Sequence, residues 1–257
     1  MLIALDFDGT LSPIVPRPGD AALLDGLEAP LRRLAGRTDS VVAIVSGRGL
    51  DDVRARVRLD GVYFAGNHGF EIEGPGLDRV HEAARAARPA LEEAAAALTA
   101  ALRDEPGAEV EDKGWTLTVH YRRAEREGAE PRVRDAVARL GRRPGLRVTE
   151  GKKVLEIRPD VDWDKGAATR FLLDVLGEGG EMPAIFIGDD RTDEDAFAVV
   201  RELGGGIVVG RPPPADTRAL AWAEGPEEVA ELIRTLADAD AISDPGRRPS
   251  PSPEAGS

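Results

Sequence analysis

Short apolar, β-branched runs alternate with helical patterns along most of this 257-residue chain, and this alternation constrains the fold more than any other feature. The apolar runs lie at 2–7, 41–47, 62–67, 184–190, 205–210 and 219–224. Helical apolar spacing falls at 20–35, 51–58, 165–176, 193–203 and 226–237. Strands that alternate with helices are typical of βα units around a parallel sheet. The sequence therefore predicts an α/β protein with a doubly wound, Rossmann-like core.

The middle of the chain follows a different pattern, which indicates a second module. Helical, strand-like, helical and hairpin-like stretches follow one another at 80–104, 115–122, 130–141 and 146–159. Alternation of the kind seen at 115–122 is typical of an antiparallel strand with one buried face. These pieces show no parallel crossover, so we expect a smaller α+β cap inserted into the core.

The expected domain boundaries follow from these two patterns. Residues 1–72 and 160–240 form the expected core, and residues 73–159 form the expected cap. The Pro/Ser-rich residues 241–257 have a composition typical of a disordered tail.

Composition narrows the classes of function. A formal net charge of −13 argues against a nucleic-acid-binding surface, which needs clustered cations. The chain has no cysteine, and it has no apolar run of the roughly 18 residues that a membrane span needs. The first apolar run begins at residue 2, so we expect no secretory signal and a cytoplasmic location. The expected partner is a small molecule, and nothing here requires an oligomer.

Two carboxylates directly follow the first apolar run. In an extended segment, residues i and i+2 point to the same side, so Asp6 and Asp8 are expected on one face at the carboxyl end of the sheet. Open α/β sheets bind their ligands at that edge. Two carboxylates at one place need a compensating cation, and a hard divalent ion such as Mg²⁺ is the simplest candidate.

A second acidic group follows the apolar run at 184–190. Asp189, Asp190 and Asp193 of the GDDRTDED segment are the candidates to complete a cation site with Asp6 and Asp8. Each acidic pair alone is compatible with a solvated loop, and Asp193 is compatible with a helix cap. Acidic groups at two strand ends favour the cation site.

Such a site suits phosphoryl transfer. With phosphate charge neutralised by a cation, the Asp6 carboxylate is able to attack phosphorus and form an aspartyl-phosphate. Asp8, crowded by like charge, is expected to have a raised pKa and to protonate the leaving oxygen before activating water.

Donors for the other phosphate oxygens are expected at three places. They are the amides around Gly9 and Thr10, the Ser46 hydroxyl after the second apolar run, and Lys165 at a predicted helix start. Each signal is weak by itself, because a Ser-Gly pair often forms a turn and a helical lysine is usually exposed.

Taken in chain order, the DFDGT, VSGR, WDKG and GDD motifs resemble those of the haloacid dehalogenase superfamily of phosphohydrolases. The resemblance implies that Asp6 is the nucleophile and Asp8 the acid/base, while Ser46 and Lys165 hold phosphate. It implies Mg²⁺ as the cofactor, bound by Asp6, by Asp189 and by Asp8 through its backbone carbonyl.

A longer set of motifs resembles the trehalose-6-phosphate phosphatases. It comprises DFDGTLSPI, SGR (46–48), GNHGFE (66–71), VHYR (119–122), GKKVLEIRP (151–159), WDKGAA and GDDRTDED, and spans residues 2–237. The resemblance implies hydrolysis of trehalose 6-phosphate to trehalose and phosphate by a stand-alone phosphatase. It also implies that Arg48 is among the substrate-binding residues.

The expected cap supplies candidates for sugar recognition, because charged groups bind hydroxyls well in a closed pocket. Lys153 and Glu156 are the preferred pair, although strand alternation places them on opposite faces unless a turn near Gly151 redirects Lys153. Asn67 and His68, after a core strand, are expected to bind the sugar near the phosphate. For Trp115 and His120, packing within the cap sheet is the favoured interpretation.

Two alternatives stay open at this point. One is a related cap-bearing phosphatase for another sugar or polyol phosphate, such as sucrose, mannosylglycerate or glucosylglycerol phosphate. The other is a phospho-accepting or sugar-phosphate-binding module without turnover, since receiver domains also combine aspartates, a hydroxyl and a lysine. Asp8 and the cap argue against this second alternative.

Overall fold

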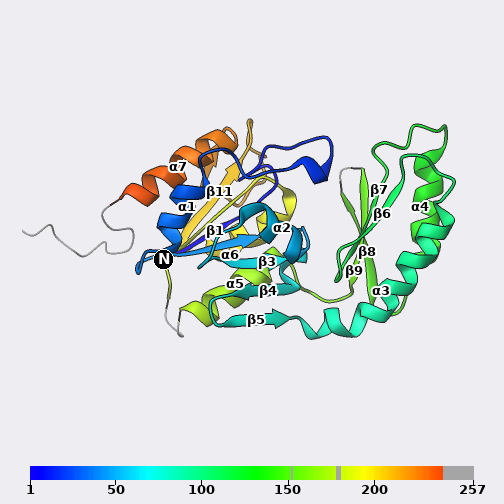
Figure 1. Ribbon diagram of the computed structural model, residues 1–257, viewed down its shortest axis with the longest axis horizontal. Helices are drawn as coiled ribbons and strands as arrows, with labels where there is room; N and C mark the ends of the chain where they lie inside the picture. The colour runs from blue at the N-terminus through cyan, green and yellow to red at the C-terminus, as the bar shows by residue number, and fades with distance from the viewer. Residues whose placement is uncertain (152, 178–180, 240–257) are drawn as a thin grey trace, which may run out of the picture.

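The computed structural model describes residues 1–151, 153–177 and 181–239, which form two sheets with their own helices (Figure 1). The larger sheet has eight strands in the order β12 (Ala221–Ala223), β11 (Gly204–Val209), β10 (Ala184–Gly188), β1 (Leu2–Leu5), β2 (Val41–Val45), β3 (Tyr63–Gly66), β4 (Glu71–Gly74) and β5 (Leu77–Val80). Strands β12 to β3 pair in parallel, whereas β4 and β5 add an antiparallel edge. The predicted α/β class with a mostly parallel core sheet is confirmed.

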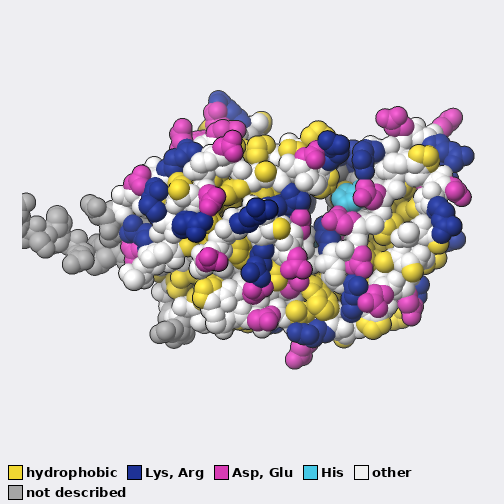
Figure 2. Space-filling model, viewed as in Figure 1, with side chains coloured by type: hydrophobic (Ala, Val, Ile, Leu, Met, Phe, Trp, Pro, Cys, Tyr) yellow, Lys and Arg dark blue, Asp and Glu magenta, His cyan; other side chains and the backbone are white. Residues whose placement is uncertain are grey.

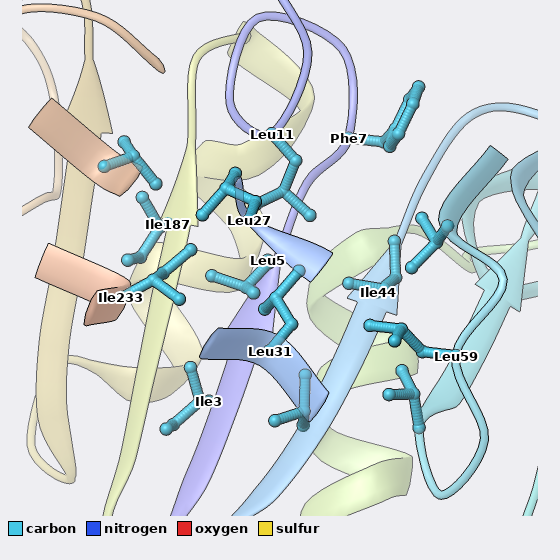
Figure 3. Close-up of a cluster of buried hydrophobic side chains, with 14 of the residues drawn as sticks. Ile3, Leu5, Phe7, Leu11, Leu27, Leu31, Ile44, Leu59, Ile187 and Ile233 are labelled. Atoms are coloured by element: carbon cyan, nitrogen blue, oxygen red, sulfur yellow. The ribbon is translucent and has the colours of Figure 1, made fainter. Parts of the chain in front are cut away.

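Helices cover both faces of the larger sheet, because alternate side chains of β1 point to opposite sides. Ile3 and Leu5 pack against α1 (Glu28–Ala35), α2 (Leu50–Val57) and α7 (Pro226–Asp238), as Figure 3 shows for Leu31 and Ile233. Leu2 and Ala4 pack against α5 (Lys165–Leu176) and α6 (Glu194–Val200). Full burial of one aliphatic side chain stabilises the fold by about 1.5 to 3 kcal/mol, so a strand buried on both faces is firmly placed.

The smaller sheet has four antiparallel strands in the order β6 (Glu109–Asp112), β7 (Leu117–His120), β9 (Val154–Pro159) and β8 (Leu146–Gly151). Helices α3 (Glu82–Ala101) and α4 (Ala129–Leu140) pack on it through a separate apolar cluster that includes Leu91, Val133 and Leu155. In Figure 1 this sheet stands between its own helices and the larger sheet. Its other face is therefore available to the core.

We expected the cap to start at residue 73, but the larger sheet continues past that residue to the end of β5 at Val80. Strand β5 pairs with β4 in the larger sheet, with Glu73 opposite Asp78 and Ile72 opposite Arg79. Ile72 and Leu77 also join the core's apolar cluster. Sequence analysis did not predict this edge because β4 and β5 are only four residues long each and lie next to the insertion. We propose a cap that runs from His81 to Pro159.

Two further expectations concern segments rather than sheets. The tail expected at 241–257 lies outside the described residues. Within the part of the chain that the structure describes, no helix combines the length and the apolar character that crossing a membrane demands.

Candidate active site

Strand ends bring the first acidic residues together. Asp6 follows β1 and is 4% exposed, and its N–H donates to the carbonyl of Ile187 on the neighbouring strand β10 at 2.8 Å. Asp189 follows β10, and Asp193 ends the short 3₁₀ helix η3 (Arg191–Asp193). Because β1 and β10 are parallel neighbours, their carboxyl ends meet at one edge of the sheet.

Lys165 lies beneath this edge, at the first position of α5. Asp164 caps that helix by accepting the N–H of Ala167 at 2.8 Å, which fixes the first turn. The Lys165 ammonium is 2% exposed and lies 2.8 Å from Asp6 Oδ1 and 2.7 Å from Asp193 Oδ1. Burial lowers the pKa of Lys165, but the carboxylates of Asp193 and Asp6 outweigh it and raise this pKa well above its usual value. The predicted proximity of Lys165 to Asp6 is present.

Asp6, Asp189 and Asp193 form an acidic cluster, with one oxygen from each lying within 4.8 Å of the others. Burial raises the pKa of Asp6 well above its usual value, and burial with the charge of Asp193 raises the pKa of Asp189 to about 7. Three hard oxygen donors with a single ammonium beside them fit a hard divalent cation such as Mg²⁺. Gly9 closes over this cluster at φ +75°, where a Cβ would lie 2.1 Å from Asp189 Oδ2.

Asp190 and Asp193, two of the expected metal ligands, form hydrogen bonds with the backbone at the start of η3. The Asp190 carboxylate accepts the N–H of Arg191 at 2.6 Å, and Asp193 Oδ2 accepts the N–H of Asp190 at 2.9 Å. The Asp190 side chain also accepts from the backbone of Asp193, and together with the bond from Asp190 N–H to Asp193 this forms a capping box at the start of η3. Neither Asp190 nor Asp8 contributes an oxygen to the acidic cluster. Asp193 takes part in the capping box of η3, but its side chain makes no cap hydrogen bond to α6, the helix that follows, so the expected cap of that helix is not present.

Asp8 faces a cation rather than the other aspartates. Its carboxylate accepts two hydrogen bonds from Arg48, from Nε and Nη2 at 2.7 Å each, while the side chain is 38% exposed. The like-charge crowding that we expected at Asp8 occurs at Asp189 instead. Arg48 is buried and also binds Asp52 at 2.6 Å and the carbonyl of Pro18 at 2.8 Å, so its guanidinium bonds to protein groups here, and its role in substrate binding stays a prediction.

The expected phosphate donors differ in whether they already donate hydrogen bonds within the protein. Ser46 is buried after β2, and its Oγ accepts the N–H of Arg48 at 3.2 Å, which leaves its own hydroxyl hydrogen available to donate. The amide of Gly9 donates to the carbonyl of Ser12 at 2.8 Å and that of Thr10 to the carbonyl of Phe7 at 3.4 Å, so both take part in the turn, and their role in binding phosphate stays a prediction. The Thr10 hydroxyl is buried without a hydrogen-bond partner among the described residues.

Asn67 and His68 lie in the short 3₁₀ helix η2 (Asn67–Gly69), both with positive φ. Asn67 is fully buried and links core to cap: Nδ2 donates to the carbonyl of Lys113 at 2.9 Å, and Oδ1 accepts from Thr116 at 2.7 Å. Its contact with sugar stays a prediction. His68 Nε2 lies 3.3 Å from Glu156 Oε1 on β9, so two residues that we predicted separately as sugar contacts meet between core and cap.

Glu156 is an ionised carboxylate whose side chain is 15% exposed. Burial raises its pKa, but His68, Lys113 and Arg158 lower the pKa to about 2. Lys153 does not join it, because the turn between β8 and β9 gives Lys153 a φ of +64° and directs its ammonium to Glu130 of α4. The redirecting turn that we considered is present, but it separates the two residues.

Sequence reasoning missed a set of contacts on the core side of the cap. Trp115 Nε1 donates to Glu71 Oε2 at 2.8 Å, whereas we expected this tryptophan to pack within the cap sheet. His120 does stay within that sheet, 2.8 Å from Glu111. The only sequence signal for Glu71 was its place at the end of GNHGFE. Figure 2 shows a histidine and several charged side chains where the surface is hollowed between core and cap.

A Rossmann-like core with an aspartate after its first strand, a buried lysine beside it and an inserted cap defines a haloacid dehalogenase-like hydrolase fold. Comparisons with known proteins narrow this class. The trehalose-phosphatase family model matches residues 4–213. The chain therefore belongs to the trehalose-phosphatase family.

Individual relatives agree with that assignment. The chain is 45% identical over 240 residues to a trehalose-phosphate phosphatase of Mycobacterium marinum, a match that covers 91% of this chain and 61% of the relative. It is 47% identical over 242 residues to an uncharacterized glycosyl hydrolase of Mycobacterium tuberculosis, covering 91% of this chain but 18% of that protein. The chain thus spans less than two thirds of either relative.

A solved structure supports the fold over both domains. The crystal structure of a trehalose-6-phosphate phosphatase related protein has a TM-score of 0.79 and 26% sequence identity, covering 92% of this chain and 97% of that one. The likeness therefore includes the cap as well as the core.

Proposed function

We propose that this chain is a Mg²⁺-dependent phosphatase that hydrolyses trehalose 6-phosphate to trehalose and phosphate through an aspartyl-phosphate on Asp6. The observation that carries this proposal is the buried Asp6 carboxylate, fixed 2.8 Å from the Lys165 ammonium and next to Asp189 and Asp193. The names of the mycobacterial relatives and the match across the cap support the choice of sugar phosphate.

The proposed chemistry has two balanced steps. An Asp6 oxygen bonds to phosphorus while the bond from phosphorus to the sugar oxygen breaks, and protonated Asp8 gives its proton to that oxygen. Ionised Asp8 then takes a proton from water, whose oxygen displaces Asp6 and yields phosphate. Mg²⁺ held by Asp6, Asp189 and Asp193 would neutralise phosphate charge.

The surrounding residues fit these roles. Lys165 keeps Asp6 oriented, and its positive charge balances part of the cluster. Arg48 holds Asp8 with a two-pronged hydrogen bond, which fixes the orientation of the Asp8 carboxyl group. Ser46 supplies a hydroxyl at the end of β2, within the same edge of the sheet.

The sugar is proposed to contact the pair formed by His68 and Glu156. Glu156 is ionised, and an ionised carboxylate accepts strong hydrogen bonds from hydroxyl groups. His68 Nδ1 is buried without a hydrogen-bond partner within the described ranges, and the ring lies over Gly47 beside Ser46. This pair thus lies beside a phosphate-site residue and carries unused hydrogen-bonding capacity. A cytoplasmic location and a small-molecule partner stay predictions.

The substrate is tested by phosphate release with Mg²⁺ from trehalose 6-phosphate, sucrose 6-phosphate, glucose 6-phosphate and p-nitrophenyl phosphate, each with an EDTA control. We expect an EDTA-sensitive preference for trehalose 6-phosphate in kcat/KM. Equal turnover of all four would favour a less selective sugar or polyol phosphatase. No turnover of any would favour the binding module and contradict the proposal.

A further inference from the structure

The turn between β6 and β7 is one part of the cap that bonds to the core near the site. Lys113 and Thr116 close this turn with a backbone hydrogen bond of 3.0 Å. From it, the Lys113 ammonium donates to the carbonyl of Gly47 at 3.2 Å, and both Lys113 and Thr116 bond to Asn67. The cap thereby reaches the residue that directly follows Ser46.

Glu71 of β4 organises the core side of this contact. Its Oε1 accepts the N–H of Leu50, at the start of α2, and Nδ2 of Asn67, both at 2.7 Å. Its Oε2 accepts the indole N–H of Trp115 from the cap turn at 2.8 Å. One carboxylate therefore joins three elements of the core to the cap.

The carboxylate of Glu71 fits beside β3 because position 66 has no Cβ. A Cβ at Gly66 would lie 2.5 Å from the backbone nitrogen of Leu50 and 2.9 Å from Glu71 Oε1. A Cβ at Gly49 would lie 3.4 Å from the carbonyl of Lys113. Gly66 thus allows the start of α2 and the Glu71 carboxylate to approach β3 closely, whereas Gly49 is in ordinary contact with the cap turn.

We propose that Glu71 is a positioning residue: through Trp115 and Asn67 it latches the cap turn to the core, and so holds Lys113 and Glu156 over the site. The latch is defined as Glu71, Asn67, Lys113, Trp115 and Thr116. The proposal rests on the proposed function only for the substrate that the closed cap receives. The existence of the latch does not depend on the substrate, because it is tested by the distance between cap and core.

Removing the indole N–H of Trp115 should favour the open cap, because Glu71 Oε2 then loses a charge-assisted hydrogen bond that exists only in the closed state. Such a hydrogen bond shifts an equilibrium by about tenfold or more. In the open cap, water replaces the indole, so the loss falls on the closed state. A smaller closed fraction weakens apparent affinity in proportion for a substrate that needs the closed state.

The first test measures cap position without reference to activity. The chain contains no cysteine, so Ala55→Cys on α2 and Thr99→Cys on α3, both exposed, accept nitroxide labels for electron-spin distance measurements. We expect Trp115→Phe, which keeps the ring but removes the donor, to broaden the distance distribution or move it to another value. Trp222→Phe, on the exposed edge strand β12, is the matched control and is expected to leave the distribution unchanged.

Glu71→Gln is the second variant and guards against a purely local effect of Trp115. Its amide oxygen is still able to accept from Leu50 and Asn67, which turns the amide NH₂ toward the indole donor. We expect the same change in distance as for Trp115→Phe. We expect the double variant to change the distance little more than either single variant, because both substitutions remove the same hydrogen bond between Trp115 and Glu71.

Kinetics separate a latch from a general structural role. We expect each variant to raise KM for trehalose 6-phosphate about tenfold, with little change for p-nitrophenyl phosphate, which is too small to need the cap. An unchanged distance distribution in both variants overturns the latch. Equal losses with both substrates also overturn it, because the effect would then act through the core. A chain that fails to hydrolyse trehalose 6-phosphate but shows the change in distance refutes the proposed function and leaves the latch in place.

Discussion

Replacing Lys165 with methionine removes an ammonium that contacts two buried carboxylates. Lys165 is 2% exposed, and its Nζ lies 2.7 Å from Asp193 Oδ1 and 2.8 Å from Asp6 Oδ1. Loss of one partner from a buried ion pair costs about 3 to 5 kcal/mol, because the remaining charge has no compensation. For a domain of this size that corresponds to a fall in Tm of roughly 6 to 20 °C.

The stability lost in Lys165→Met should depend on pH, because the protonation of the buried Asp6 carboxyl group depends on pH. Burial already raises the pKa of Asp6, and the variant raises it further because the ammonium is gone. A carboxyl whose pKa is higher in the folded than in the unfolded chain binds its proton more tightly when folded. Stability is therefore lost as the pH rises through the folded pKa, and the variant should be less impaired at pH 5 than at pH 7.5.

Urea unfolding with EDTA at these two pH values measures the effect. Arg32→Met is the control, because Arg32 forms an exposed ion pair with Glu28, whose contribution is expected to stay below about 1 kcal/mol. A free-energy loss at pH 7.5 of less than about 1 kcal/mol for Lys165→Met, or an equal loss at pH 5, would refute the reasoning.

Three further predictions concern the same architecture. Because burial raises the pKa of Asp189 to about 7, the metal-free protein should lose thermal stability as the pH rises from about 4 to 7, and Mg²⁺ should restore it; a Tm independent of Mg²⁺ contradicts this. Arg48→Met should lower kcat for trehalose 6-phosphate about tenfold to a hundredfold by releasing Asp8, and an unchanged kcat would count against it. Phe186→Ala should reduce the free energy of unfolding in urea by about 3 to 5 kcal/mol, since this buried ring packs edge-on against Phe197, whereas exposed Leu220→Ala should change little; equal effects exclude this account.

Much of the core was predictable because its signals are local. The run before Asp6 is apolar at every position, and a strand buried on both faces requires helices on both sides of the sheet. The position of Asp6 and Asp189 then follows from parallel pairing, which brings the ends of neighbouring strands to one edge. Strand β5 escaped prediction because its four residues carry no pattern that distinguishes a sheet edge from the start of a cap.

The partners of polar side chains were less predictable, since they depend on contacts between distant segments. Asn67 has the same hydrogen-bonding groups whether it meets sugar or the backbone of Lys113, 46 residues away. Arg48 likewise suits phosphate or carboxylate, and the fold places Asp8 beside it. Lys153 was ambiguous because a hairpin turn, rather than strand alternation, decides its direction.

The central claim is that Asp6 performs phosphoryl transfer on trehalose 6-phosphate. Its most direct test compares phosphate release from that substrate by the unaltered chain and by Asp6→Asn, each with Mg²⁺ and with EDTA, after circular dichroism has shown that both are folded. We predict Mg²⁺-dependent release by the unaltered chain and none above background by Asp6→Asn. Substantial release by folded Asp6→Asn would contradict the account.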